Sequence, residues 1–477
     1  MSLVPDSKIL SVISSSEVNF GTSGARGLVN QFADSVCAAF VLAFAEVMAK
    51  QFQFSRIAIA IDHRPSSPKM AAACSGAARA LGLEVDYYGV LPTPALALQS
   101  MADNLPAIMV TGSHIPFDRN GLKFYRPDGE IDKSDEKAIL SVDRELPAFE
   151  PGLPDVSSSA RQGYIQRYLE LFPDGVLKGK RIGLYEHSAA GRDINRDILE
   201  ALGAEVVSLG RTDTFVPIDT EAVSEEDRAL GRQWAKEYNL DAILSTDGDG
   251  DRPLVADERG EWLRGDVLGL LAAQALEVDA LAIPVSCNSA IEKSSSFKAV
   301  KRTRIGSPYV IEGMAELSDE FSSVAGFEAN GGFLLGTDLQ LRGTTLKALP
   351  TRDALLPALM LLTGAASQGK RVSEMLLALP ERYTASDRVK EFPTAQSKAL
   401  IEQWRESPLL LQEAMGLDSD VGAIDTTDGL RVTLENGRIV HFRPSGNAPE
   451  LRCYVEAETA DDASELLKGC MSALNRL

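Results

Sequence analysis

The sequence predicts an α/β protein built from several domains. The chain has 477 residues, which is too long for one hydrophobic core and suggests roughly three domains, give or take one. A strand–helix–strand pattern recurs along most of the chain, and the C-terminal part follows a different pattern. Strands that alternate with helices are typical of parallel α/β sheets. The predicted fold is therefore a series of α/β domains followed by a smaller α+β domain.

The recurring pattern is a strand, a helix and a second strand. The first copy comprises Ser55–Ile61, about Pro68 to Leu81, and Ala80–Val85, and the second comprises Arg181–Tyr185, about Asp193 to Leu202, and Ala201–Val206. In both copies the helix ends in Ala-Leu-Gly and the next strand follows at once. This order predicts βαβ units with parallel strands. Chance similarity between generic βαβ units is the alternative, because such patterns are degenerate.

Each copy leads into a further strand that opens into a polar loop. Ala107–Thr111 precedes Gly112-Ser113-His114, and Ala242–Thr246 precedes a run of aspartates. In a weaker third copy, Ala282–Val285 is one strand, and Val324–Phe327 leads into Glu328-Ala-Asn-Gly-Gly332. Ligands of open α/β sheets bind beyond the carboxyl ends of the strands. The three loops are therefore candidates for a binding site.

The C-terminal part predicts a separate α+β domain, linked near Gly364 to Arg371. Its elements are a hairpin of Gly429–Glu435 and Arg438–Arg443 around Asn436-Gly437, a loop from Pro444 to Glu450, a strand at Leu451–Glu456, and a helix from about Ala460 to Leu474. Asn-Gly is a strong hairpin turn. Asp461 and Asp462 suit the first turn of the helix.

The aspartate loop carries the strongest functional indication. Asp247, Asp249 and Asp251 alternate with glycines and end in Arg252. Glycines let the backbone turn sharply, so the carboxylates can converge, and converged carboxylates favour a hard cation such as Mg²⁺ or Ca²⁺. Arginine matches phosphate geometry. The alternatives are a solvated Asp-Gly turn and a calcium EF-hand with Glu258 at the twelfth position, although Arg252 stands where that motif needs glycine.

Three further loops contain residues suited to catalysis or binding. Ser113 is a candidate nucleophile at the end of a strand, with an ordinary turn serine as the alternative. Glu328 and Asn330 suit hydrogen bonding to sugar hydroxyls. Arg443-Pro-Ser445-Gly-Asn447 combines donors that fit a phosphate. Capped or ordinary turns are the alternatives for the last two loops.

Composition disfavours several classes of protein. The net charge of −20 disfavours nonspecific binding to nucleic acid or to an anionic membrane. The five cysteines are scattered without a Cys/His cluster, which disfavours zinc and favours reduced thiols in a cytoplasmic protein. The sequence shows neither a signal peptide nor an apolar run of the roughly 18 residues that a transmembrane helix needs.

Together these motifs resemble the α-D-phosphohexomutase superfamily, and within it the bacterial phosphomannomutase/phosphoglucomutase branch. Phe20–Gly27, Asp62–Ser67 and Pro92-Thr-Pro94 fit the first domain, and the loops at Thr111–Pro116, Asp247–Arg252, Glu328–Gly332 and Arg443–Asn447 follow in the family's order. The resemblance implies three similar α/β domains with mixed sheets around a deep cleft plus a smaller C-terminal α+β domain. The expected bounds are 1–150, 151–256, 257–368 and 369–477.

The resemblance also implies a reaction. The family moves a phosphoryl group reversibly between O6 and O1 of a hexose phosphate, through a phosphoserine enzyme and a hexose 1,6-bisphosphate that serves as activator and intermediate. Mannose phosphates are the expected substrates and glucose phosphates a further pair. One Mg²⁺ per chain, a cytoplasmic location and a monomer or homodimer are expected, without nucleic-acid or membrane partners.

The resemblance assigns roles residue by residue. Ser113 would carry the phosphate and, with Asp247, Asp249 and Asp251, hold Mg²⁺. The other catalytic residues would be Lys123, Arg26, His114 and Arg252. The substrate-binding residues would be Glu328, Asn330, Gly306, Ser307, Arg443, Ser445, Gly446, Asn447 and Arg452.

The sequence departs from the family's pattern at two loops. Many relatives have serine at the position of Asn330 and histidine at that of Gly332, and threonine is commoner than Asn447. These differences bear on substrate preference more than on the reaction class. Phosphoglucosamine mutase, a non-catalytic phosphosugar-binding protein and a metal-dependent phosphatase are the alternative functions.

Overall fold

The computed structural model describes residues 8–21, 24–445 and 449–477 of the chain. It divides into two compact units, each made of two stretches of sequence. Unit 1 contains Met1–Val278 and Ser322–Leu376, and unit 2 contains Asp279–Phe321 and Leu377–Leu477. No helix among the described residues has the length and apolar character that crossing a membrane requires.

The first sheet of unit 1 is mixed, with strand order β1-β2-β6-β5-β3-β4 and β7 paired to β6. Its strands are β1 Asn19–Phe20, β2 Ala25–Leu28, β3 Arg56–Ile61, β4 Glu84–Val90, β5 Ala107–Val110, β6 Arg119–Arg126 and β7 Gly129–Glu130. The helices are α1 Ile9–Ser15, α2 Asp34–Ala49, α3 Ser67–Ala80, α4 Thr93–Ala102 and α5 Lys133–Leu140, with a 3₁₀ turn at Val29–Gln31. β3 is parallel to β4 and β5, as the βαβ pattern predicts, whereas β6 is antiparallel to β5.

The second sheet repeats this arrangement. Its order β11-β10-β8-β9 matches β6-β5-β3-β4, with β8 parallel to β9 and β10, and β10 antiparallel to β11. The elements are β8 Arg181–Tyr185, β9 Glu205–Leu209, β10 Ala242–Thr246, β11 Pro253–Ala256, α6 Ser159–Leu169, α7 Arg192–Ala201 and α8 Glu225–Tyr238. The Ser113 loop and the aspartate loop therefore follow equivalent strands, β5 and β10, which confirms the predicted internal repeat.

The remainder of unit 1 contains the strand that precedes Glu328. β14 Val324–Phe327 pairs antiparallel with β15 Phe333–Leu335, and β15 pairs antiparallel with β18 Leu349–Asp353. The other elements are the hairpin β16 Leu339–Leu341 and β17 Thr344–Leu346, and the helices α9 Gly265–Ala275, α12 Leu355–Ser367 and α13 Val372–Leu376. The predicted link near Gly364 to Arg371 overlaps the end of α12, and the unit ends at Leu376.

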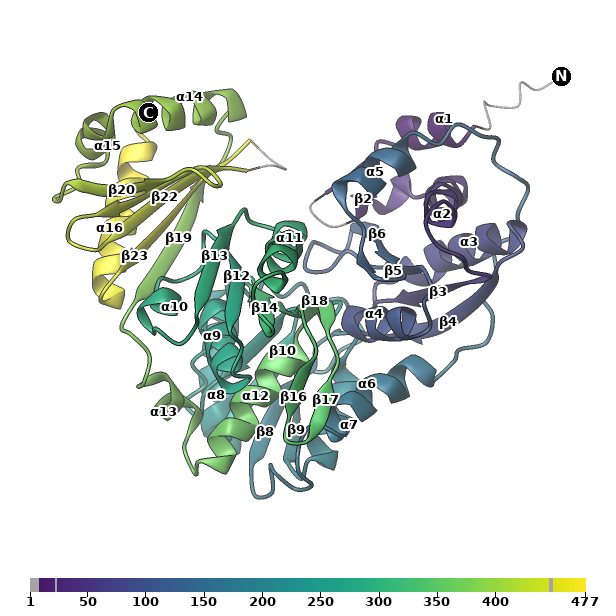
Figure 1. The fold of residues 1–477 in the computed structure, drawn as a ribbon, viewed down its shortest axis with the longest axis horizontal. Helices are drawn as coiled ribbons and strands as arrows, with labels where there is room; N and C mark the ends of the chain where they lie inside the picture. The colour runs from purple at the N-terminus through teal and green to yellow at the C-terminus, as the bar shows by residue number, and fades with distance from the viewer. Residues whose placement is uncertain (1–7, 22–23, 446–448) are drawn as a thin grey trace. The chain divides into compact units, whose positions relative to one another are not determined.

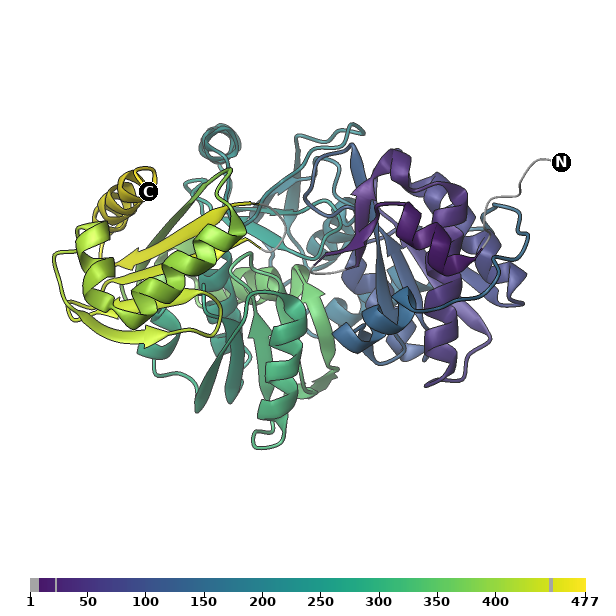
Figure 2. The ribbon, with the colours of Figure 1, turned by 90° about the horizontal axis from the view of Figure 1, so that it is seen from above.

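Unit 2 combines a small α/β segment with the predicted C-terminal domain. The segment contains parallel strands β12 Ala280–Pro284 and β13 Ala299–Thr303, with α10 Ala290–Lys293 and α11 Ser307–Ser318. The C-terminal sheet is antiparallel in the order β19-β23-β22-β21-β20. Its strands are β19 Tyr383–Val389, β20 Val421–Asp425, β21 Leu430–Leu434, β22 Ile439–Pro444 and β23 Leu451–Ala457. Figures 1 and 2 show its helices beside it: α14 Thr394–Glu406, α15 Pro408–Met415 and α16 Ala460–Leu474.

Candidate active site

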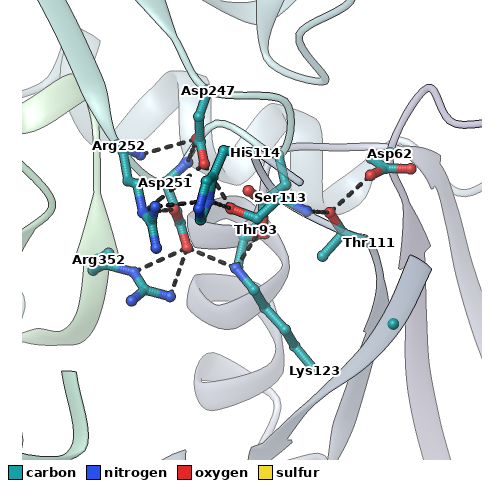
Figure 3. Close-up of polar contacts among 12 residues, drawn as sticks. Asp62, Thr93, Thr111, Ser113, His114, Lys123, Asp247, Asp251, Arg252 and Arg352 are labelled. Carbon is teal, nitrogen blue, oxygen red and sulfur yellow. Dashed lines mark hydrogen bonds and ion pairs between the residues drawn. The ribbon is translucent and has the colours of Figure 1, made fainter. Parts of the chain in front are cut away.

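Ser113 lies in a strained and buried position. It follows β5 with a φ of 52°, in the left-handed region that side chains other than glycine rarely adopt, and it is 0% exposed. Its backbone N–H donates to Thr111 Oγ1 at 2.8 Å, and its Oγ donates to Asp247 Oδ2 at 2.7 Å. Strain of this kind concentrates at functional sites. The hydroxyl therefore points at the aspartate loop, as Figure 3 shows. Ser113 thus differs from an ordinary turn serine, which would be exposed to solvent.

Arg64 fixes the Ser113 loop through hydrogen bonds to its backbone carbonyls, a role that the sequence did not reveal. Its guanidinium, 1% exposed, donates at 2.5–2.9 Å to the carbonyl oxygens of Ser113, Ile115, Pro116 and Arg119. Asp62 accepts from Arg64 Nε at 3.2 Å and from Thr111 Oγ1 at 2.7 Å. The sequence signal that could have indicated this role is the βαβ pattern. Parallel pairing of β3 with β5 places the residues that follow the two strands at one edge of the sheet.

The three aspartates converge as predicted. Asp247, Asp249 and Asp251 are each 0% exposed, and one carboxylate oxygen from each lies within 4.8 Å of the others. Gly250, with a φ of 72°, makes the turn that brings them together. Oδ1 of Asp249 and Oδ1 of Asp251 are buried and receive no hydrogen bond from the described residues. Buried carboxylate oxygens that accept no hydrogen bond are suitable ligands for Mg²⁺.

Neither alternative for this loop agrees with the structure. A solvated turn would leave the carboxylates exposed, whereas all three are buried. An EF-hand needs flanking helices and a ligand at Glu258, but the loop joins strands β10 and β11. Glu258 instead accepts from the hydroxyl of Ser373 at 2.5 Å.

Positive side chains balance the aspartates. Lys123 Nζ lies 2.5 Å from Asp249 Oδ2 and 2.7 Å from Asp251 Oδ2. Burial acts to raise the pKa of Asp249, but the Lys123 ammonium lowers it below its usual value. Burial, followed by the Asp249 and Asp251 charges, holds the pKa of Asp247 well above its usual value. Lys123, together with the arginines around the cluster, therefore offsets the charge of three buried carboxylates.

Arginines surround the place where a phosphate on Ser113 would stand. Burial first, and then Arg252 and Arg352, lower the pKa of Arg26 to about 10, so three guanidinium groups crowd this site. Arg252 Nη1 donates to His114 Nδ1 at 2.8 Å, and that nitrogen lies 3.4 Å from Ser113 Oγ. Burial, followed by the Arg252 charge, lowers the pKa of His114 to about 3, so its imidazole is neutral at physiological pH. Clustered guanidiniums beside a hydroxyl are suited to a phosphoryl group.

The loop after β14 is compact and mostly buried. Glu328 N–H donates to Gly332 O at 3.1 Å, and Asn330 Oδ1 accepts from Gly332 N at 3.0 Å. Asn330 therefore offers its amide nitrogen, more than its oxygen, to a ligand. Arg352 runs past Gly332 and donates to Glu328 Oε2 at 3.1 Å. Arg352 was not among the predicted site residues, because nothing in the sequence near β18 marks it.

Unit 2 brings together the remaining predicted residues that the structure describes. Asp428 Oδ2 accepts from Arg443 Nε at 2.8 Å and from Ile305 N at 3.0 Å, which places the Gly306-Ser307 turn near Arg443. Arg443 pairs in register with Arg452 on the neighbouring strand. A cavity of about 920 Å³ is lined by residues that include Arg443, Ser445, Lys398 and Arg405. Gly446 and Asn447 lie outside the described residues.

Comparisons with known proteins agree with this geometry. Four family models match in order: phosphoglucomutase/phosphomannomutase alpha/beta/alpha domains I, II and III at residues 17–145, 163–260 and 264–383, and the C-terminal domain at 380–470. A phosphomannomutase of Salmonella muenchen is 56% identical, covering 97% of this chain and 96% of the relative. One of Sinorhizobium fredii is 44% identical, covering 96% and 98%.

Solved structures show the same fold. The crystal structure of a putative phosphomannomutase from Thermus thermophilus matches with a TM-score of 0.77 at 21% identity, covering 96% of this chain and 99% of that one. At this identity the match concerns the fold alone, whereas the sequence relatives cover nearly the whole chain at higher identity. The chain therefore belongs to the phosphoglucomutase/phosphomannomutase family, within the α-D-phosphohexomutases.

Proposed function

We propose that this chain is a phosphomannomutase that interconverts mannose 6-phosphate and mannose 1-phosphate through a phosphoserine at position 113. The observation that carries the proposal is the contact of 2.7 Å between Ser113 Oγ and Asp247 Oδ2, at the edge of a buried trio of aspartates. Relatives at 56% and 44% identity that bear the name phosphomannomutase support the choice of sugar. A phosphate on Ser113 would stand against the trio, with Arg26 and Arg252 beside it.

The reaction needs two phosphoryl transfers. In the first, the bond between phosphorus and Ser113 Oγ breaks and a bond between phosphorus and a sugar hydroxyl oxygen forms. Lys123, entering this step as a neutral amine and not as the ammonium paired with Asp249 and Asp251, would take the hydroxyl proton and pass it to Ser113 Oγ, which leaves as a hydroxyl. In the second, the other phosphate of the hexose 1,6-bisphosphate moves to Ser113 Oγ, and a proton returns to the hydroxyl that it leaves. The sugar must reverse in the site between the two steps. Phosphoryl transfer of this kind depends on positioning and charge stabilisation more than on covalent chemistry by other groups.

Asp247, Asp249 and Asp251 would hold the Mg²⁺ ion, one per chain. When bound, that ion would neutralise charge on the transferring phosphoryl group. Arg252 and Arg26 contribute fixed positive charge at the same place, and the neutral His114 accepts a hydrogen bond from Arg252 and so fixes its direction. Glu328 and Asn330 would bind sugar hydroxyls. Arg443, Ser445 and Arg452 would hold the phosphate that is not reacting, together with Gly306 and Ser307.

The remaining proposals concern the cellular location and the oligomeric state. All five cysteines are free and buried, which supports a reducing compartment such as the cytoplasm. We propose a monomer or homodimer, which mass measurement in solution would test.

A coupled assay tests the proposal directly. The enzyme is given Mg²⁺, a trace of hexose 1,6-bisphosphate, and mannose, glucose or glucosamine phosphate in turn. We expect the highest kcat/KM with mannose phosphates. Higher kcat/KM with glucosamine phosphate would make the protein a phosphoglucosamine mutase. Phosphate release without isomer formation would indicate a phosphatase, and binding without turnover would indicate a non-catalytic protein.

Substitution of Ser113 tests the mechanism. Ser113→Ala should abolish mutase turnover and remove a phosphorylated species from the intact mass spectrum. Ser100→Ala is the matched control, because Ser100 is also buried and donates only to a carbonyl of its own helix. Retained turnover in Ser113→Ala, or equal phosphorylation of both variants, would place the phosphate elsewhere.

A further inference from the structure

One buried arginine joins the aspartate loop to the Glu328 loop. Arg352 is 2% exposed and stands on β18. Its Nε lies 3.0 Å from Asp251 Oδ2, its Nη2 lies 3.0 Å from the same oxygen, and its Nη1 lies 3.1 Å from Glu328 Oε2. Figure 3 shows the guanidinium aimed at Asp251, opposite Lys123. A planar guanidinium can satisfy two carboxylates in this way because its donors form a rigid fork, which a lysine ammonium does not.

Gly332 makes room for this arginine. A Cβ atom added at Gly332 would lie 2.6 Å from Arg352 Cδ, 2.7 Å from Cγ and 3.1 Å from Cβ. The φ of Gly332 is outside the left-handed region, so the backbone does not require glycine there. Space is therefore the reason for the glycine, and any side chain at this position would displace the stem of Arg352.

The backbone on either side of the arginine is anchored. Thr351 Oγ1 donates to Glu130 Oε1 at 2.6 Å. Asp353 accepts hydrogen bonds from two buried tyrosines of α6, Tyr164 and Tyr168. With both neighbours fixed, the arginine has little freedom to follow a carboxylate that moves. It therefore sets the position of the carboxylates instead of adapting to them.

The two oxygens of Asp251 have different surroundings. Oδ2 accepts from Lys123 Nζ at 2.7 Å and from Arg352, whereas Oδ1 is buried and receives no hydrogen bond from the described residues. Arg252 Nε lies 3.7 Å from Oδ1, too far for a hydrogen bond, so the orientation that Arg352 holds leaves Oδ1 able to bind a cation. The same side chain places a positive charge against Glu328, which is 4% exposed.

We propose that Arg352 is a positioning residue that orients Asp251 for the cation and Glu328 for the sugar, and that Gly332 exists to admit it. The sugar half of this inference rests on the proposed function, whereas the cation half does not. Groups that orient metal ligands through hydrogen bonds typically contribute 10–100-fold to metal affinity. Loss of the guanidinium should therefore weaken cation binding by about that factor and, at the same time, raise KM for the hexose phosphate.

The first test measures binding of Mn²⁺, as a paramagnetic substitute for Mg²⁺, by electron paramagnetic resonance on the sugar-free enzyme. Arg352→Met keeps the stem and removes the guanidinium, and we expect about 10–100-fold weaker binding. Arg352→Lys should recover only part of the loss, because one ammonium cannot serve both carboxylates. Arg382→Met is the matched control: it removes a buried arginine paired to Glu456 at 2.6 Å in unit 2 and should leave Mn²⁺ affinity unchanged.

The second test is a double-mutant cycle that does not depend on Arg352→Met folding. Gly332→Ala should weaken Mn²⁺ binding and raise KM for mannose 6-phosphate in the native background. In Arg352→Ala, the same glycine substitution should add much less, because the two nearest atoms, Cδ and Cγ, are gone and only the Cβ at 3.1 Å remains. Native Mn²⁺ affinity in Arg352→Met or in Gly332→Ala, or additive losses in the double variant, would overturn the proposal. Failure of the native enzyme to convert mannose phosphates would refute the proposed function and leave the Mn²⁺ comparison intact.

Discussion

Replacing His187 with glutamine should make unfolding of unit 1 less sensitive to acid. His187 is 0% exposed, and its Nε2 lies 2.8 Å from the carbonyl oxygen of Thr246, directly before the aspartate loop. Its Nδ1 is buried and has no hydrogen-bond partner among the described residues. Burial, opposed by the hydrogen bond to Thr246 and assisted by the nearby Arg192 charge, lowers the pKa of His187 from 6.5 to about 4. The folded protein therefore holds this imidazole neutral.

The sign and size of the effect follow from linkage. Between pH 6.5 and pH 4 the unfolded chain protonates His187 and the folded chain does not, so the contribution to stability is present above pH 6.5 and is lost as the pH falls. A pKa difference of about 2.5 corresponds to about 3.4 kcal/mol in full, of which about 3 kcal/mol is lost by pH 4, with a slope of at most about 1.4 kcal/mol per pH unit. Glutamine does not titrate and can still donate to the Thr246 carbonyl.

A tryptophan close to the histidine provides the assay. The Tyr185 ring lies 5.2 Å from that of His187 and 4.9 Å from that of Trp234. With Trp262 and Trp404 replaced by phenylalanine, Trp234 fluorescence reports urea unfolding around this site. The urea concentration at the unfolding midpoint should decrease as the pH is lowered from 7 to 5, and it should decrease less in His187→Gln. An equal pH dependence in the two proteins would refute the assignment of a neutral buried histidine.

Three further predictions concern the site loops and the cation. Gly112→Ala would place a Cβ 2.5 Å from Arg64 Cζ, so we expect about 1–3 kcal/mol of destabilisation and a lower kcat. The control is Gly364→Ala, whose Cβ would lie 4.0 Å from its nearest neighbour, and it should change neither the stability nor kcat. Asp428→Asn removes the charge that orients Arg443 and should raise KM about tenfold with kcat less affected; an unchanged KM would exclude this role. Chelation by EDTA should abolish turnover in the coupled assay and added Mg²⁺ should restore it, and full activity without divalent cations would rule out the metal assignment.

The sequence predicted the local structure well and the contacts between distant segments poorly. The hairpin around Asn436-Gly437 and the helix Ala460–Leu474 follow from turn chemistry and periodicity, and the structure has both. The convergence of Asp247, Asp249 and Asp251 was predictable because short Asp-Gly loops have few ways to fold. The equivalence of the loops after β5 and β10 was also visible, because it depends on a repeated pattern.

Arg64 and Arg352 show what local patterns do not reveal. Each is a buried guanidinium whose partners lie far away in sequence: Arg64 binds carbonyls 49 to 55 residues away, and Arg352 reaches Asp251 at a separation of 101. By local pattern neither arginine differs from an exposed one, and although Arg64 lies in the family-like segment Asp62–Ser67, the resemblance gave it no role. The glycines beside them, Gly112 and Gly332, carry the matching information, but a glycine that is needed for space has no pattern that separates it from a turn glycine.

The charges around Ser113 lead to a last prediction, that cation binding and phosphorylation depend on each other. A phosphoserine carries about −1.5 to −2 charges at pH 7. It would stand against Asp247, whose Oδ2 is 2.7 Å from Ser113 Oγ and whose pKa is already raised by burial and by its acidic neighbours. Repulsion at that distance makes the phosphorylated enzyme without a cation unfavourable, and the three carboxylates alone leave coordination positions of Mg²⁺ open.

Reciprocity of coupled binding then requires that phosphate on Ser113 strengthen cation binding by the factor by which the cation stabilises the phosphate. Calorimetric titration of Mg²⁺ into the phosphorylated and dephosphorylated forms should give a lower Kd for the former, although both contain all three aspartates. Ser113→Ala should behave like the dephosphorylated form, because it can carry no phosphate. Equal Kd values for the two forms would mean that the serine oxygen takes no part in the metal site.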